Sequence, residues 1–140
     1  MKRILTAFAL SAMLLMVGCT SDDQKIVEEL EGTWQVTQVT VNGIPADEST
    51  YENDSYTFES CKVAQGDCDG TYSTEDPTKG TTSYSFTYSI HDEGTKITIN
   101  MSILGIPSTS TGTIEEHSDS RFVWTVVDDF GDETTTTIEK

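Results

Sequence analysis

The amino-acid sequence predicts an all-β protein: an eight-stranded antiparallel up-and-down barrel preceded by one short helix. Apolar and polar residues alternate with period two from Gly32 to the end of the 140-residue chain, as expected for strands with one buried face. Short turns join eight such segments with no helical pattern between them, which favours a meander. Eight strands suffice for a sheet to close on itself and lose its exposed edges.

A single short helix is expected before the first strand. Ser21 followed by Gln24 has the form of a capping box, and Ile26, Val27 and Leu30 then repeat at helical spacing. Gly32 is a typical helix stop. The helix should therefore bury one apolar stripe against the sheet that follows.

The first strand contains a change of phase. Trp34 and Val36 share one face, whereas Val39 and Val41 fall on the other, and such a change marks a β-bulge or a sharp bend. The Asn-Gly pair at 42–43 predicts a turn, and a loop should then run to about residue 54.

The other strands follow from alternation and turn residues. They are expected over 56–58, 69–73, 83–90, 96–103, 109–116, 122–127 and 134–139. The pattern is weakest over 109–116, where Ile114 is the only large apolar residue.

The first nineteen residues have the pattern of an export signal. Lys2 and Arg3 give a basic start, residues 4–17 are nearly all apolar, and Gly18-Cys19 follows, which is the order found in a secretory signal peptide. The apolar run is shorter than the about 20 residues of a membrane-spanning helix. Residues 16–19, Met-Val-Gly-Cys, resemble the lipobox of bacterial lipoproteins, where Leu is more usual at the first position.

The lipobox resemblance divides the chain into a signal peptide (1–18), a lipidated tether (19–24) and a barrel domain (25–140). It implies that the Cys19 thiol receives a diacylglyceryl group, that the peptide is cut before Cys19, and that the new amine is acylated. The membrane would then be a partner through acyl chains such as palmitate. An ordinary secretory signal with an incidental cysteine is the alternative.

Residues 20–23, Thr-Ser-Asp-Asp, resemble the acidic signal that sends such lipoproteins to the outer face. The same acids would also be favourable at a helix N-terminus. The expected location is the bacterial cell envelope, lipid-anchored at the outer membrane, with surface exposure if the acidic signal operates.

The mature chain is strongly acidic. The sequence has 24 Asp and Glu against eight Lys and Arg, and two of the basic residues belong to the signal peptide. Such a surface repels nucleic acid and anionic lipid, so nucleic acid is not an expected partner. Solubility explains the acidity, and specific cation capture is the alternative.

No cofactor and no metal are assigned. Asp67, Asp69, Thr71 and Ser73 alternate like oxygen ligands for Ca²⁺, but they depart from the EF-hand pattern. Alternation along a strand also places these residues on one face without any metal. The acidic turn at 128–133 is no stronger as a candidate.

Cys61 and Cys68 are expected to form a disulfide, because they are an isolated pair in an exported chain. The short loop between them gives a stabilisation of about 2–3 kcal/mol in the chain-entropy model. A zinc site would need further ligands, and His91 and His117 lie far away in the sequence.

The sequence predicts a non-enzymatic protein. It contains no GxSxG, no HExxH and no phosphate-binding loop, and Cys19 is assigned to the lipid. His91 and His117 fall at expected strand or loop ends, where exposed histidines are ordinary.

Gly32-Thr33-Trp34, directly after the short helix, resembles the GxW motif of lipocalins, and residues 25–140 resemble the small lipocalin-like lipoprotein domains of Bacteroidota. The resemblance implies a barrel with Trp34 at its closed end and a late basic residue packed across that ring. Arg121, the only arginine of the mature chain, is the candidate, although it begins the seventh strand.

Nine aromatic residues are candidates for the barrel interior: Trp34, Tyr56, Phe58, Tyr72, Tyr84, Phe86, Tyr88, Phe122 and Trp124. They are either a packed core or the wall of a lumen in which phenolic hydroxyls orient a ligand. In the first case the protein is a filled barrel that acts as a surface interaction or accessory module for a protein or glycan. In the second, which we favour, it is a monomer that binds a small apolar or amphipathic molecule, in a cavity of about 300 Å³ or more.

Overall fold

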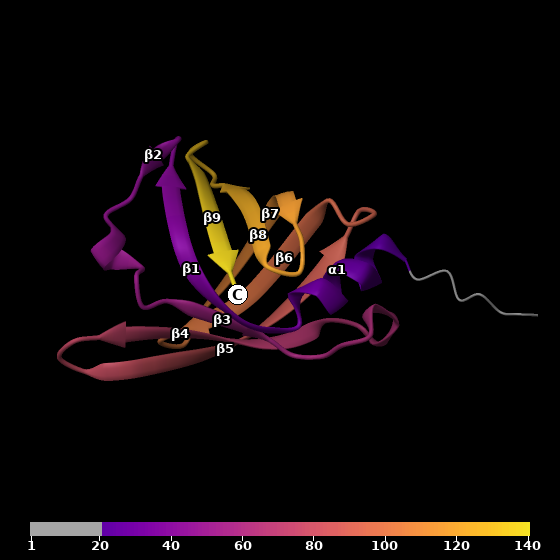
Figure 1. The fold of residues 1–140 in the computed structure, drawn as a ribbon, viewed down its shortest axis with the longest axis horizontal. Coiled ribbons are helices and arrows are strands. Elements are labelled where there is room, and N and C mark those ends of the chain that lie inside the picture. The colour runs from indigo at the N-terminus through magenta and orange to yellow at the C-terminus, as the bar shows by residue number, and fades with distance from the viewer. Residues whose placement is uncertain (1–20) are drawn as a thin grey trace, which may run out of the picture.

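The computed structural model describes residues 21–140, in which eight antiparallel strands close into a barrel with one α-helix before them (Figure 1). The signal peptide, Cys19 and Thr20 lie outside the described residues. The elements are α1 (Asp22–Leu30), β1 (Gly32–Val41), β2 (Ile44–Pro45), η1 (Glu48–Thr50), β3 (Ser55–Phe58), η2 (Val63–Gln65), β4 (Cys68–Asp76), β5 (Gly80–His91), β6 (Lys96–Ile103), β7 (Ile106–His117), β8 (Arg121–Val127) and β9 (Glu133–Glu139). The expected fold class is confirmed.

Each strand pairs with its neighbour in the chain, and pairing of β1 with β9 closes the barrel. The two-residue β2 pairs only with the end of β1, at Thr40 and Val41, and lies outside the closed ring. The sequence predicts a loop here, since two residues are too few to show the alternation of a strand.

Ser21 caps the N-terminus of the helix as expected: its hydroxyl accepts a hydrogen bond of 3.2 Å from the Gln24 amide. Only this half of the capping box forms, because the Gln24 side chain reaches instead to the β3–β4 connection. The first helical residue is Asp22. Ile26, Val27 and Leu30 are its buried residues.

The phase change in β1 is a β-bulge, as predicted. The first part of β1 pairs with β3, the later part pairs with β9, and the register to β9 shifts between Val36 and Gln38. The bulge turns Val39 back toward the core, so that both halves of the strand contribute inward side chains.

The β4–β5 hairpin extends beyond the rest of the barrel (Figure 1). β4 pairs with β5 from Cys68 and Tyr88 to the turn at Asp76 and Gly80, whereas the β5–β6 ladder begins only at Phe86. The first half of β5 therefore diverges from β6, and the barrel is split at this end.

Two ends of the barrel can be defined from the connections. The closed end holds α1, the β3–β4, β5–β6 and β7–β8 connections and Lys140. The open end holds residues 42–54 and the β4–β5, β6–β7 and β8–β9 turns.

Candidate functional site

The closed half of the barrel is filled with aromatic rings. Phe58, Phe86 and Tyr88 are all buried. The Phe58 ring meets Phe86 at a centroid distance of 5.5 Å and Tyr88 at 5.0 Å, both edge to face, which is a favourable arrangement for aromatic pairs. Phe122, with an exposed fraction of 0%, completes this layer from β8. These four candidates form core and leave no room for a ligand.

Helix α1 covers the closed end. The indole nitrogen of Trp34 donates a hydrogen bond of 2.6 Å to the carbonyl of Leu30, the last helical residue, and the Trp34 side chain is fully buried. At the other end of α1 the Asp23 carboxylate accepts a hydrogen bond of 2.6 Å from the Gly94 amide in the β5–β6 turn. Trp34 therefore lies at the closed end, as the resemblance implied, and does not line a lumen.

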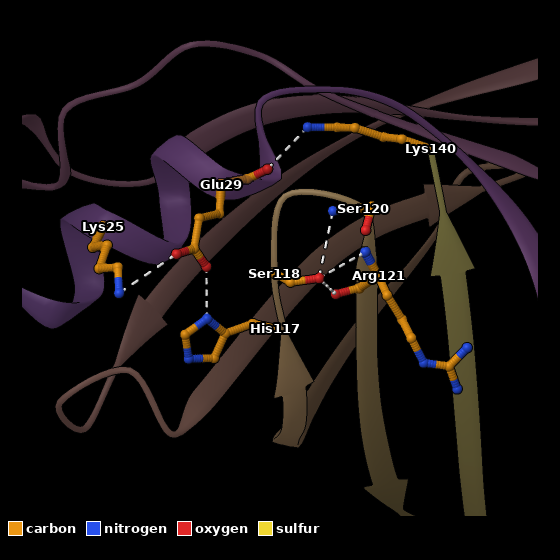
Figure 2. Close-up of polar contacts among 7 residues, drawn as sticks. All are labelled: Lys25, Glu29, His117, Ser118, Ser120, Arg121 and Lys140. Carbon is orange, nitrogen blue, oxygen red and sulfur yellow. Dashed lines mark hydrogen bonds and ion pairs between the residues drawn. The ribbon is translucent and has the colours of Figure 1, made fainter.

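The basic residue over Trp34 is Lys140, and the expectation for Arg121 was wrong. The Lys140 ammonium lies 4.4 Å from the centre of the Trp34 ring and donates to the Glu29 carbonyl (Figure 2). The Arg121 guanidinium points away from α1 in Figure 2 and forms ion pairs with Glu116 and Glu139. The reason is register, because Arg121 pairs with Glu139 across the β8–β9 ladder and faces outward beside it.

Cys61 and Cys68 form the expected disulfide. The bonded loop is held against α1 by Gln24, whose amide nitrogen donates to the Cys61 carbonyl (3.1 Å) and whose oxygen accepts from the Val63 amide (2.9 Å). The disulfide and the helix therefore stabilise the closed end together.

The open half of the barrel contains a cavity of about 310 Å³. It is lined by Tyr56, Tyr72, Ile99, Met101, Ile103, Ser108, Ser110, Trp124, Val126 and Thr136. Of the nine aromatic candidates, only Tyr56, Tyr72 and Trp124 lie on its wall. Tyr56 and Trp124 meet edge to face, with ring centroids 5.7 Å apart, at the boundary between the cavity and the filled half.

Tyr84 belongs to the projecting hairpin. Its ring stacks on Tyr72 at a centroid distance of 6.3 Å, and it lines a separate outer hollow of about 550 Å³ with Leu104 and the β4–β5 turn. A third hollow, of about 360 Å³, occupies the split between the β4–β5 and β6–β7 hairpins, and Met101 and Ser108 are common to it and to the cavity. The two spaces therefore share part of one wall.

Sequence reasoning missed the small polar residues that make room for the cavity. Ser108 and Ser110 line it and face Met101 and Ile99 across the β6–β7 ladder. This is the segment whose alternation was weak, and its weakness was the signal. A strand with small inward residues opposite large ones leaves a space.

Two phenols line the cavity, and the carboxylate of Asp54 lies next to one of them. The Tyr72 hydroxyl donates a hydrogen bond of 2.5 Å to Asp54. Burial, and then the negative charge of Asp54, raise the pKa of Tyr56 to about 12. Burial and the hydrogen bond to Asp54 also raise the pKa of Tyr72. Both hydroxyls therefore stay neutral donors over the ordinary pH range.

The other residues considered for catalysis or metal binding do not come together in the described part of the chain. His117 contacts Glu29 on α1 at 2.6 Å (Figure 2). The ring of His91 shares a hydrogen bond with the Thr98 hydroxyl instead, so the two histidines contact different elements. Within residues 21–140, no three His, Cys, Asp or Glu side chains gather in a way that would hold a metal ion. None of the helices in these residues is long and apolar enough to cross a membrane.

A family model described as a lipocalin-like domain matches residues 30–124. Among solved structures, a lipocalin-like protein from Bacteroides uniformis is 17% identical, with a TM-score of 0.56, and the match covers 80% of this chain and 98% of that one. Bovine odorant binding protein, solved with its natural ligand, is 18% identical with a TM-score of 0.50, over 80% of this chain and 71% of the other.

A redesigned β-barrel, mFAP0, solved with the small molecule DFHBI, is 15% identical with a TM-score of 0.52, over 80% of this chain and 99% of the other. At these identities the likeness is one of fold. No curated protein sequence matches the chain.

Proposed function

We propose that this chain, which belongs to the lipocalin-like domain family, is a non-enzymatic, lipid-anchored binding protein of the bacterial cell envelope that holds one small apolar or amphipathic molecule in the open half of its barrel. The cavity of about 310 Å³ carries the proposal. It reaches the size at which pockets take up small molecules, and its mixture of apolar walls with a few hydroxyls is typical of such pockets.

The distribution of packing supports binding over the alternative of a filled barrel. An interaction module would need no interior space, whereas here the aromatic rings fill only the closed half. Ligands of the two structural neighbours, an odorant binding protein with its natural ligand and a redesigned barrel with DFHBI, agree with such a use of the fold.

The binding proposal is tested by native mass spectrometry of residues 20–140, purified from the periplasm without detergent. A bound mass that disappears on denaturation is the expected result. A matched pair of variants locates the site. Ser110→Phe places a ring in the cavity, whereas Thr111→Phe places the same ring on the exposed outer face of the same strand. Loss of the bound mass in both variants, or in neither, would contradict a cavity site.

When the purified protein carries no host ligand, wild type and the same two variants are titrated with decanol. Binding is measured by the displacement of the neutral dye N-phenyl-1-naphthylamine. We expect saturable binding to wild type and Thr111→Phe, and none to Ser110→Phe. The absence of binding to folded wild type would overturn the proposal and favour a filled barrel.

Anchoring is proposed from the lipobox resemblance at residues 16–19. Two or more acyl chains hold a protein stably on a bilayer, whereas one holds it only marginally. We expect metabolic labelling with an alkyne-tagged palmitate to mark the wild-type protein, and Cys19→Ala to remove the label and release the protein from the membrane pellet. Retention of Cys19→Ala in the pellet would contradict this part of the proposal.

The non-enzymatic character is supported by the separate roles of the two histidines on the outside of the barrel. Reproducible turnover that a single polar substitution removes would overturn it.

A further inference from the structure

Positive charge is distributed unequally between the two ends of the barrel. In residues 21–140, five of the six Lys and Arg side chains belong to the closed end: Lys25, Lys62, Lys96, Arg121 and Lys140. The open end has one, Lys79, on the β4–β5 turn. The open end also carries ten carboxylates: Asp47, Glu48, Glu52, Asp54, Glu75, Asp76, Asp128, Asp129, Asp132 and Glu133.

The closed-end cations are already engaged, and none lines the cavity. Lys25 and Lys62 pair with glutamates of α1, and Arg121 pairs with glutamates of its neighbouring strands. Lys96 donates to Thr113, and Lys140 to the Glu29 carbonyl. An anionic headgroup in the cavity would therefore meet no positive side chain on its wall, because Lys79, the one cation of the open end, lines the outer hollow instead.

The cavity and its immediate surroundings offer groups that suit a cation. Tyr56, Tyr72 and Trp124 line the cavity, and the Asp54 carboxylate accepts the hydrogen bond of the Tyr72 hydroxyl. A carboxylate beside aromatic rings is a favourable setting for an ammonium group, through ion pairing and cation–π contact. Burial is the main cause of the raised pKa of Tyr56, and the negative charge of Asp54 adds to it, so this carboxylate acts on the cavity wall.

Besides its carboxylates, the open end exposes large apolar side chains. The large hydrophobic side chains that are exposed in residues 21–140 all belong to it: Val41, Ile44, Ile103, Leu104, Ile106, Val127 and Phe130. Phe130 is 93% exposed and Leu104 is 87% exposed. Such a concentration on one end marks a surface that meets an apolar partner or ligand.

We propose that the ligand of this barrel is a cationic amphiphile, a molecule with an apolar body and an ammonium head, and that Asp54 with the aromatic wall selects the head. The proposal rests on the proposed binding function and adds the charge of the ligand. Its apolar body would contact the side chains of the β6–β7 wall, and carboxylate ligands such as fatty acids would be excluded.

The test compares three probes with the same ten-carbon chain, each below its critical micelle concentration: decyltrimethylammonium, decanol and decanoate. Their dissociation constants for residues 20–140, which hold the whole closed sheet and α1, are measured by displacement of N-phenyl-1-naphthylamine. We expect the ammonium to bind tightest and the carboxylate to bind at least about tenfold more weakly than the alcohol, the order of effect of one nearby charge.

Two substitutions identify the group responsible. Asp54→Asn keeps an acceptor for Tyr72 and should reduce the preference for ammonium over alcohol about tenfold. Asp119→Asn removes the same charge from an exposed turn at the closed end and should leave the preference unchanged. Ser110→Phe should abolish ammonium binding, which separates capture in the cavity from general attraction of a cation to an acidic protein.

The outcomes distinguish this inference from the proposed function. If decanoate bound as tightly as the ammonium, the inference that the ligand is positively charged would be wrong, while the proposed binding in the cavity would stand. If the preference for ammonium over alcohol persisted in Asp54→Asn, or was reduced equally by Asp119→Asn, Asp54 would not be the residue that selects the head. Failure of all three probes to bind would overturn the proposed function itself.

Discussion

The Lys140 ammonium lies 4.4 Å from the centre of the Trp34 ring and from there donates a hydrogen bond of 3.0 Å to the Glu29 carbonyl. One side chain thus joins the end of the last strand to the first strand and to α1. Because the ring is buried and the carbonyl belongs to the last turn of the helix, the contact combines cation–π attraction with satisfaction of a helix end.

Lys140→Ala should lower the free energy of unfolding by about 1 kcal/mol, the size of a partly exposed cation–π contact. Arg121→Ala is the matched control. Its ion pairs are on the surface, and such pairs contribute roughly 0–1 kcal/mol. Chemical denaturation followed by tryptophan fluorescence measures both. A larger loss for Arg121→Ala than for Lys140→Ala would restore Arg121 as the residue that stabilises this end.

The disulfide loop and α1 should be energetically coupled through Gln24. We expect replacement of Cys61 and Cys68 together by alanine to cost about 2–3 kcal/mol of stability, and Gln24→Ala to cost about 1 kcal/mol. Without the disulfide the loop is less fixed, so Gln24→Ala should cost less in that background. A double-mutant cycle gives the coupling, and strict additivity of the two changes would contradict it.

Gly70 should tolerate no larger side chain. A Cβ atom there would lie 2.3 Å from the Phe86 ring and 2.8 Å from the Thr57 carbonyl. Gly70→Ala is therefore expected to destabilise the barrel by about 1–3 kcal/mol, as overpacking does. Thr71→Ala, at the next position, controls for strand propensity. Adding Phe86→Leu should recover part of the loss, and no recovery would place the strain at the Thr57 backbone instead.

Stability should fall at alkaline pH because of Tyr88. Burial, and then the charge of Glu31, raise its pKa from 10.0 to about 12 in the folded protein. Between these two pKa values the Tyr88 hydroxyl loses its proton in the unfolded chain but keeps it in the folded chain. The stability that depends on the neutral Tyr88 is therefore fully present below pH 10 and is lost as pH rises toward 12. We expect a loss of about 2 kcal/mol from this residue. The measurement is denaturation of wild type and Tyr88→Phe across this range, and equal slopes would contradict the assignment.

The sequence predicted the fold well because the signals were local. Alternation along β5 and β6, the bulge near Val36, the serine cap of α1 and the disulfide each follow from residues close together in the chain. The loop containing β2 was predicted without its strand, since a two-residue pairing depends on its partner rather than on its own pattern.

The sequence predicted three of the residues on the cavity wall, because alternation shows which aromatic side chains face the barrel interior. It could not predict how far each one lies along the barrel axis. Alternation places Tyr56 and Phe58 on the same face, yet one borders the cavity and the other is buried core. Height depends on strand stagger, which no single segment encodes. The expectation for Arg121 was wrong for a related reason, because pairing with Glu139 across the β8–β9 ladder holds Arg121 beside that residue, while Lys140 reaches Trp34.

Helix α1 closes the barrel at one end. Trp34, Leu30 and Ile26 seal the interior there, so a ligand bound as proposed would have to enter and leave through the open half. A second molecule cannot push the first out from behind. Exchange must then be dissociative, with a replacement rate that levels off at the off-rate of the departing ligand however high the concentration of its competitor.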